Sequence, residues 1–143
     1  MLGYQSRIRQ GIISTTGSAI VLTSAYADNI SNVLPIGGAA KVTVYVSYTL
    51  AAGETNNNIL LRIDTSHDSS TMYQLLNESV SGGTSTLTQR EFTFQGATSV
   101  ATSYNLALPL DVSDNFIRVA IRETGNSPAY GTAHAWILIC GDK

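Results

Sequence analysis

The chain has 143 residues, of which 43% are hydrophobic and only 13% are charged, and its formal net charge is −2. This length and hydrophobicity indicate one folded domain, which excludes disorder and argues against a second domain. The weak negative charge argues against a nucleic-acid partner, and the lack of an apolar run of about 18 residues argues against a membrane span.

The first 17 residues combine apolar side chains with two arginines and show no clean periodicity. We therefore divide the chain into an N-terminal arm, residues 1–17, and a β-sandwich domain, residues 18–143. Two interpretations of the arm are open. It is either a frayed terminus or extra edge strand of its own domain, or else an extended segment that lies on a neighbouring molecule. We predict the second reading and assign to a partner interface the arm residues Leu2, Tyr4, Arg7, Ile8, Arg9, Ile12 and Ile13.

Two strongly alternating segments follow. In residues 41–50, apolar side chains occupy every second position from Val42 to Leu50, which predicts a strand with one buried face. Residues 58–65 repeat the pattern, with Asp64 on the outward face. Because the residues between them have the composition of a turn, we expect the two strands to form a hairpin or a corner.

Three further strands are predicted in the C-terminal half. In residues 104–112, large apolar side chains occupy every second position. Pro109 lies in this segment and has no backbone N–H to donate to a neighbouring strand, so it marks an edge strand or a bulge. In residues 116–122, apolar and other side chains alternate, and the arginines lie on the outward face. Residues 132–140 are apolar on both faces, which is typical of a strand covered from both sides.

Weaker strand candidates lie at residues 19–23, 71–78 and 86–94, so we expect about eight strands and no helix. Strands of this number and spacing are typical of a jelly roll or an immunoglobulin-like sandwich. We prefer the jelly roll because Cys140 is the only cysteine, which excludes the Cys-Trp-Cys framework of true immunoglobulin domains. The predicted fold is all-β, a jelly-roll-like antiparallel β-sandwich with an extended N-terminal arm.

Few residues are candidates for catalysis or metal binding. Asp64, His67 and Asp68 could in principle hold a divalent cation, but a strand that ends in a polar turn explains the same residues. His134 shares a strand face with Trp136, which favours a core or interface position for both. Because no catalytic or phosphate-binding motif occurs, we predict no enzyme activity, no cofactor and no metal site, and we add Trp136 to the partner interface.

Two surface alternatives stay open. Arg62, Arg118 and Arg122 are expected on outward faces, where they either pair with carboxylates or bind a phosphate or an acidic glycan. The candidate carboxylates are Asp64, Glu91 and Glu123. A neutral glycan would need a cluster of exposed aromatic rings, and alternation alone assembles no such cluster.

Residues 108–125 and 130–139 resemble the C-terminal half of small β-sandwich virion proteins of tailed bacteriophages, including head decoration (cement) proteins. The resemblance implies a jelly-roll protomer without catalytic residues that forms a homo-oligomer, with a trimer favoured, on the major capsid protein. The expected location is the virion, assembled in the host cytoplasm, which agrees with the absence of a recognisable secretory signal. The alternative function is a glycan- or receptor-binding module of a phage tail or fibre.

Overall fold

The computed structural model describes residues 5–11, 19–28, 30–37, 41–52, 58–95, 103–112, 114–124 and 129–142. These residues form twelve strands and one short 3-10 helix, η1 (Tyr26–Asp28). The strands are β1 (Gln5–Gly11), β2 (Ile20–Val21), β3 (Leu34–Pro35), β4 (Lys41–Thr49), β5 (Asn58–Ser66), β6 (Tyr73–Gln74), β7 (Leu76–Ser81), β8 (Thr84–Gln89), β9 (Glu91–Gln95), β10 (Ser103–Asp111), β11 (Phe116–Thr124) and β12 (Thr132–Asp142).

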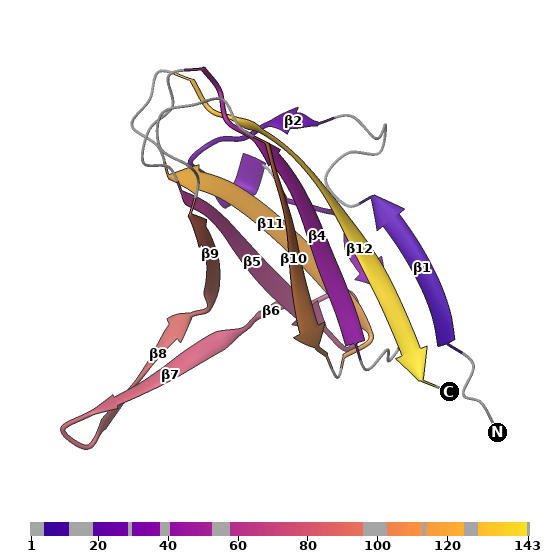
Figure 1. Ribbon diagram of the computed structural model, residues 1–143. Helices are drawn as coiled ribbons and strands as arrows, with labels where there is room; N and C mark the ends of the chain where they lie inside the picture. The colour runs from indigo at the N-terminus through magenta and orange to yellow at the C-terminus, as the bar shows by residue number, and fades with distance from the viewer. Residues whose placement is uncertain are drawn as a thin grey trace.

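Two antiparallel sheets pack face to face, and a separate two-stranded ribbon projects from them (Figure 1). The first sheet has the order β1-β12-β4-β10, with β2 also paired to β12. The second has the order β3-β11-β5-β6, with β9 also paired to β5, and the ribbon is the β7–β8 hairpin.

The strand pairs are nested along the chain. β1 and β2 pair with β12, β3 with β11, β4 with β10, and β5 with β9. A long antiparallel hairpin rolled onto itself produces this order, which is the topology of a jelly roll. The predicted fold class is therefore confirmed. The strand number exceeds the prediction partly because two weak candidates are each divided: residues 71–78 contain β6 and the first half of β7, and residues 86–94 contain parts of β8 and β9.

The core lies between the two sheets and is built by the predicted alternation. Along β4 and at Leu50, which follows it, every second side chain from Val42 onward is buried. β11 contributes Ile117, Val119 and Ile121 from the other sheet, all without exposed surface. Apolar side chains at every second position therefore fix which face of each strand points inward.

Three local predictions can now be compared with the structure. β4 and β5 lie in different sheets, so the predicted hairpin or corner is a corner. β10, which carries Pro109, ends the first sheet and is an edge strand, as predicted. Asp64 lies on the outward face and pairs with arginines, as predicted, and its side chain is buried because Arg62 and Arg118 cover its carboxylate.

The N-terminal segment is partly described. β1 pairs with β12 along its whole length, with Ile8 opposite Ile139 and Gly11 opposite Trp136. The backbone of residues 5–11 is thus an edge strand of the first sheet. Of the predicted interface residues, Arg7, Ile8 and Arg9 lie in this strand. The other arm residues assigned to the interface, Leu2, Tyr4, Ile12 and Ile13, fall outside the described residues.

Candidate functional site

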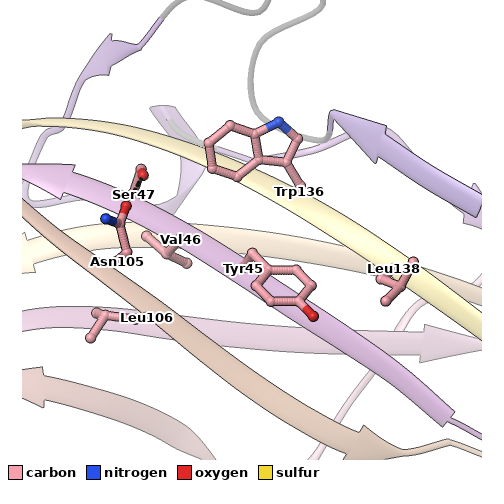
Figure 2. A pocket seen from close by; sticks show the side chains of 7 residues that line it. All are labelled: Tyr45, Val46, Ser47, Asn105, Leu106, Trp136 and Leu138. Carbon is pink, nitrogen blue, oxygen red and sulfur yellow. Dashed lines mark hydrogen bonds between the residues drawn. The ribbon is translucent and has the colours of Figure 1, made fainter.

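The outer face of the first sheet carries a shallow groove of about 420 Å³ across β10, β4 and β12 (Figure 2). We call it the sheet groove and define it by its lining residues, Tyr45, Val46, Ser47, Asn105, Leu106, Trp136 and Leu138. Trp136 lies opposite Tyr45 in the register of β12 and β4. The next position across the sheet is Ala107, whose small side chain leaves the Tyr45 ring 37% exposed.

Besides the Tyr45 hydroxyl and the Trp136 indole N–H, the sheet groove has two polar side chains, Ser47 and Asn105. The Ser47 hydroxyl donates a short hydrogen bond to Oδ1 of Asn105. The remaining lining residues are aromatic or aliphatic, and none of the seven is charged. The groove therefore favours an apolar, uncharged occupant.

A second hollow, of about 380 Å³, continues along β4 and β10. Its lining includes Lys41 and Thr43 from β4 and Pro109 and Asp111 from β10. Thr43 pairs with Pro109, and Tyr45 pairs with Ala107 in the same register. The two hollows therefore follow each other along one pair of strands, and the far end carries a lysine and an aspartate.

His134 lies on the same strand as Trp136 and is buried. The two ring centroids are 4.1 Å apart, so the prediction that these side chains share a strand face is confirmed. The imidazole lies against an aromatic ring, and its Nε2 has no hydrogen-bond partner among the described residues.

The β7–β8 hairpin projects away from both sheets (Figure 1). Its turn is Gly82-Gly83, and both glycines have positive φ, 58° and 79°, which a two-residue type I′ turn requires. At its base, the Arg90 N–H donates to the Leu75 carbonyl at 2.8 Å. The hairpin is therefore a regular antiparallel ribbon that is attached to the body only at its base.

The two faces of this hairpin differ in chemistry. Ser, Thr and Asn occupy every position of one face, namely Asn77, Ser79, Ser81, Thr84, Thr86 and Thr88. The other face carries Leu76, Val80 and Leu87, which we call the hairpin face, and they alternate there with Glu78, Ser85 and Gln89. The exposed fractions of Leu76, Val80 and Leu87 are 52%, 68% and 63%, which are high for aliphatic side chains. Glu78 shares this face and accepts a short hydrogen bond from the Ser85 hydroxyl.

The outer face of the second sheet carries the three predicted arginines. Arg118 donates to Oδ2 of Asp64 through Nε at 3.1 Å and Nη2 at 2.7 Å, and Arg62 contacts the same carboxylate at 3.2 Å. Arg122 donates to Oε1 of Glu91 at 3.2 Å. Of the two readings for these arginines, the structure supports pairing with carboxylates.

Tyr26 joins these pairs from η1. Its hydroxyl donates to Oε1 of Glu91 at 3.0 Å, and the guanidinium carbons of Arg62 and Arg122 each lie 5.0 Å from its ring centroid. Burial raises the pKa of Tyr26 to about 12, because the charged phenolate is disfavoured away from water. The cluster covers this sheet face with ion pairs and contacts between guanidinium groups and a ring.

The third expected carboxylate has a different role. Glu123 is fully buried, and its Oε2 accepts a hydrogen bond from the Gly131 N–H at 3.0 Å. Gly131 is held so closely that a Cβ there would lie 2.5 Å from the Thr49 carbonyl oxygen and from the Tyr48 hydroxyl. Glu123 therefore ties the end of β11 to the start of β12 and is not a partner of the arginines.

The segment after β5 is a polar turn, as its composition predicts. Asp68 Oδ1 accepts hydrogen bonds from the backbone N–H groups of Thr71, at 3.1 Å, and Ser70, at 2.9 Å, which hold the pKa of Asp68 well below its usual range. His67 stacks on Tyr73, with ring centroids 5.9 Å apart.

Two of the three residues considered for a cation lie close together, with His67 Nε2 3.8 Å from Asp68 Oδ2, but Asp64 lies apart from them. Asp64 faces Arg62 and Arg118 and is buried, whereas Asp68 and His67 lie in the exposed turn. Within the described ranges, no three His, Cys, Asp or Glu side chains lie close enough to hold a metal ion. No helix in that part of the chain is long and apolar enough to cross a membrane.

Of the predicted interface residues, the structure places Trp136 in the sheet groove. The hairpin face was missed, because Leu76, Val80 and Leu87 are too sparse to form a strong alternating pattern. The signal that identifies it is the Gly-Gly pair between two segments rich in Ser and Thr, which marks a two-residue hairpin. A comparison with protein-family models and with curated proteins finds no match to this chain.

Proposed function

We propose that this chain is a non-enzymatic structural protein of a bacteriophage virion, of the capsid decoration or cement type. In this role, many copies bridge adjacent subunits of the major capsid protein and raise the free energy needed to separate them. The observation that carries the proposal is the hairpin face, on which Leu76, Val80 and Leu87 are exposed to solvent along a projecting ribbon. Exposed apolar surface of this kind marks contacts with other proteins.

The engagement of the polar side chains supports a structural role over a catalytic one. Asp64 and Glu91 are paired with arginines, and His134 packs on Trp136. Groups held in this way stabilise the body of the protein, whereas a catalytic base must reach a substrate. The resemblance of residues 108–125 and 130–139 to phage virion proteins points to the same class.

The N-terminal segment is the second proposed contact with the capsid. β1 lies at the edge of the first sheet, so its outer side is a position where another chain can add to the ladder. The segment also contains Arg7 and Arg9, which would meet carboxylates of a neighbour. Residues 1–17 therefore remain the predicted partner-binding segment, now with an edge strand as the element that presents it.

The proposal is tested on purified particles of the phage that encodes the chain. We expect mass spectrometry of these virions to find the chain in many copies, and cryo-EM to place it on the outside of the head. In a binding assay with heads that lack the chain, Val80→Asp should weaken attachment, while Ser79→Asp, on the opposite hairpin face, should not. Absence of the chain from purified virions would contradict the proposal.

A second candidate function is a glycan- or receptor-binding module of a phage tail or fibre. The observation that favours it is the sheet groove, where Tyr45 and Trp136 are neighbours across two strands, with Ser47 and Asn105 beside them. Aromatic faces stack on sugar rings, and amide and hydroxyl groups bind their hydroxyls.

This candidate makes its own prediction. Isothermal titration calorimetry with neutral oligosaccharides should show binding that Tyr45→Ala abolishes and that Tyr73→Ala, at an exposed ring outside the groove, leaves unchanged. Cryo-EM should then place the chain on the tail. A chain that binds no glycan and coats the head would reject this alternative.

A further inference from the structure

Glu123 is an acidic residue in the apolar core. It follows Ile117, Val119 and Ile121 on the inward face of β11, and its exposed fraction is 0%. Ile59, which lies opposite Glu123 in β5, is also buried. A carboxyl group away from water loses the solvation that stabilises its ionised form. Glu123 therefore needs either a nearby positive charge or a bound proton.

Three hydrogen bonds connect Glu123 to two other segments. The Gly131 N–H donates to Glu123 Oε2 at 3.0 Å. The Glu123 N–H donates to the Thr23 carbonyl at 3.0 Å, and the Leu22 N–H donates to the Gly131 carbonyl at 2.9 Å. We call these three hydrogen bonds the Glu123 joint. β11 belongs to the second sheet, and Gly131 directly precedes β12 of the first sheet, so the joint connects the two sheets.

The carboxyl group itself has few partners. Oε2 accepts the Gly131 N–H, while Oε1 is buried and has no hydrogen-bond partner among the described residues. The Tyr48 hydroxyl lies beside the same glycine, since a Cβ on Gly131 would lie 2.5 Å from it. Tyrosine ionises near about pH 10, so Tyr48 brings no charge at neutral pH. One hydrogen bond from a neutral donor compensates little of the cost of a buried negative charge.

The second sheet brings no positive charge to this carboxyl group. The charged side chains of β5, β9 and β11 lie on the outer face of the sheet and pair with one another there, namely Arg62, Asp64, Glu91, Arg118 and Arg122. Arg90 is exposed at the base of the hairpin and lies over the Phe92 ring. Residues 125–128, between β11 and β12, contain no ionisable side chain, and residues 50–57 contain one charged residue, the acidic Glu54.

The first sheet contributes neutral groups and distant basic residues. Tyr104 lies opposite Tyr48 and Tyr130 precedes Gly131, and both tyrosines are uncharged at neutral pH. His134 lies on the outer face of β12, whereas Glu123 points into the core. The basic residues of this sheet lie toward the other end of β12 from Gly131, namely Arg7, Arg9 and Lys41. Within the described part of the chain, Glu123 thus has no ion-pair partner.

We propose that Glu123 carries a proton at neutral pH and that this proton keeps the Glu123 joint closed. With Oε1 protonated, the carboxyl group is neutral and Oε2 still accepts the Gly131 N–H. When the proton leaves to solvent at higher pH, an unpaired negative charge remains in the core, so water must enter and the joint loosens.

The sign of the pH dependence follows from the proton that the folded chain retains. The stability from the protonated carboxyl group is fully present below about pH 4.3, where glutamate is protonated in the unfolded chain as well. It is lost as the pH rises through the point at which Glu123 ionises in the folded chain. The proposal concerns the fold of this chain and does not rest on the virion function.

The first test compares urea unfolding at about pH 5 and about pH 8. Glu123→Gln keeps an acceptor for the Gly131 N–H and cannot ionise. Between the two pH values, the unfolding equilibrium constant should rise about 10-fold or more further in the unsubstituted chain than in Glu123→Gln, because only the former has a proton to lose from the core. The two histidines titrate in both chains, so their contributions cancel.

Glu78→Gln is the matched control, since it makes the same substitution at an exposed position of the hairpin. Its pH dependence should equal that of the unsubstituted chain. A pH dependence in Glu123→Gln that equals that of the unsubstituted chain would overturn the proposal. A steeper rise in Glu123→Gln would also overturn it, because that result requires an ionised Glu123 in the folded chain.

A second measurement detects the proton in the unsubstituted chain and does not require the variant to fold. The chain contains four glutamates, so carbon-13 labelling of glutamate gives four side-chain carboxyl resonances in NMR spectra. At neutral pH we expect the resonance of Glu123, assigned through its backbone, at the position of a protonated carboxyl group. The other three should show ionised carboxylates. Four ionised carboxylates at neutral pH would overturn the proposal.

Discussion

The body of the jelly roll and the β7–β8 hairpin use the same alternation and reach opposite outcomes. In β4, the apolar face of Val42, Val44 and Val46 is at most 1% exposed. In the hairpin, the apolar side chains of Val80 and Leu87 remain 68% and 63% exposed. Alternation thus decides which side chains share a face, whereas the topology decides whether the same chain covers that face. An apolar face without a cover within its own chain points to a contact with another molecule.

The largest difference between the two regions is expected when an aliphatic side chain is shortened to alanine in each. Ile63→Ala, in the core, should lower the free energy of unfolding by about 2–5 kcal/mol, because it removes buried methyl groups and leaves a cavity. Val80→Ala should change it by less than about 0.5 kcal/mol at concentrations where the chain is monomeric. Urea denaturation followed by Trp136 fluorescence measures both values. Equal losses would show that the hairpin is part of the body's cooperative unit.

Glycine substitutions sharpen the same contrast. Gly131→Ala, in the body, forces a Cβ against the Thr49 carbonyl and should cost about 1–3 kcal/mol of unfolding free energy. Gly83→Ala meets no atom but lies at a φ of 79°, so its strain is confined to the hairpin turn. We expect it to accelerate hydrogen exchange in β7 and β8 while leaving the exchange of β4 unchanged. Faster exchange in β4 would contradict this separation.

The N-terminal segment tests how far the body extends. Deletion of residues 1–17 removes β1 and its hydrogen bonds to β12. We expect the free energy of unfolding to fall by about 1–2 kcal/mol, because the loss of several backbone hydrogen bonds is partly offset by the entropy that the segment no longer loses on folding. Tm should fall by about 4 °C for each kcal/mol. Differential scanning calorimetry measures the shift, and native circular dichroism at low temperature should persist. An unchanged Tm would mean that this segment contributes nothing to the body.

The smallest expected effect is a pH dependence at the outer face of the second sheet. The pKa of Tyr26 is raised to about 12 from 10.0, so the neutral phenol contributes stability that is fully present below pH 10 and is lost as the pH rises toward 12. In an absorbance titration, Tyr26 should contribute to the absorbance change near pH 12, and Tyr26→Phe should reduce the amplitude of this late change by that of one tyrosine. Tyr45→Phe, in the sheet groove, should leave the late amplitude unchanged. A late amplitude that is the same in Tyr26→Phe and in the unsubstituted chain would contradict the assignment.

The sequence was sufficient to predict the main strands and their inward faces. Residues 41–50 and 116–122 carry apolar side chains at every second position, and this period depends only on local backbone geometry. Whether β4 pairs with β5 or turns a corner depends on partners far away in the chain, so the local pattern left both open. The burial of Asp64 depends likewise on Arg118, which is distant in sequence and lies directly opposite Asp64 on the neighbouring strand β11.

The candidate site was harder to predict than the fold. Trp136 was assigned to an interface from its apolar strand, but its pairing with Tyr45 requires the register of β12 against β4. The hairpin face was not foreseen, because its three aliphatic residues are divided between two strands that otherwise contain polar side chains. Its Gly-Gly turn was the remaining local signal.

The nested strand order also affects how the chain reaches this structure. β12 completes the pairing of β1, β2 and β4, so the first sheet cannot assemble until β12 has been synthesised. Such distant pairings impose a large loop-closure entropy and are associated with folding in milliseconds to seconds. The β7–β8 hairpin lies at the centre of the nest and closes over two glycines, so its ladder carries the smallest closure cost. The hairpin can therefore form early and bring together the two halves of the chain that later become the sandwich.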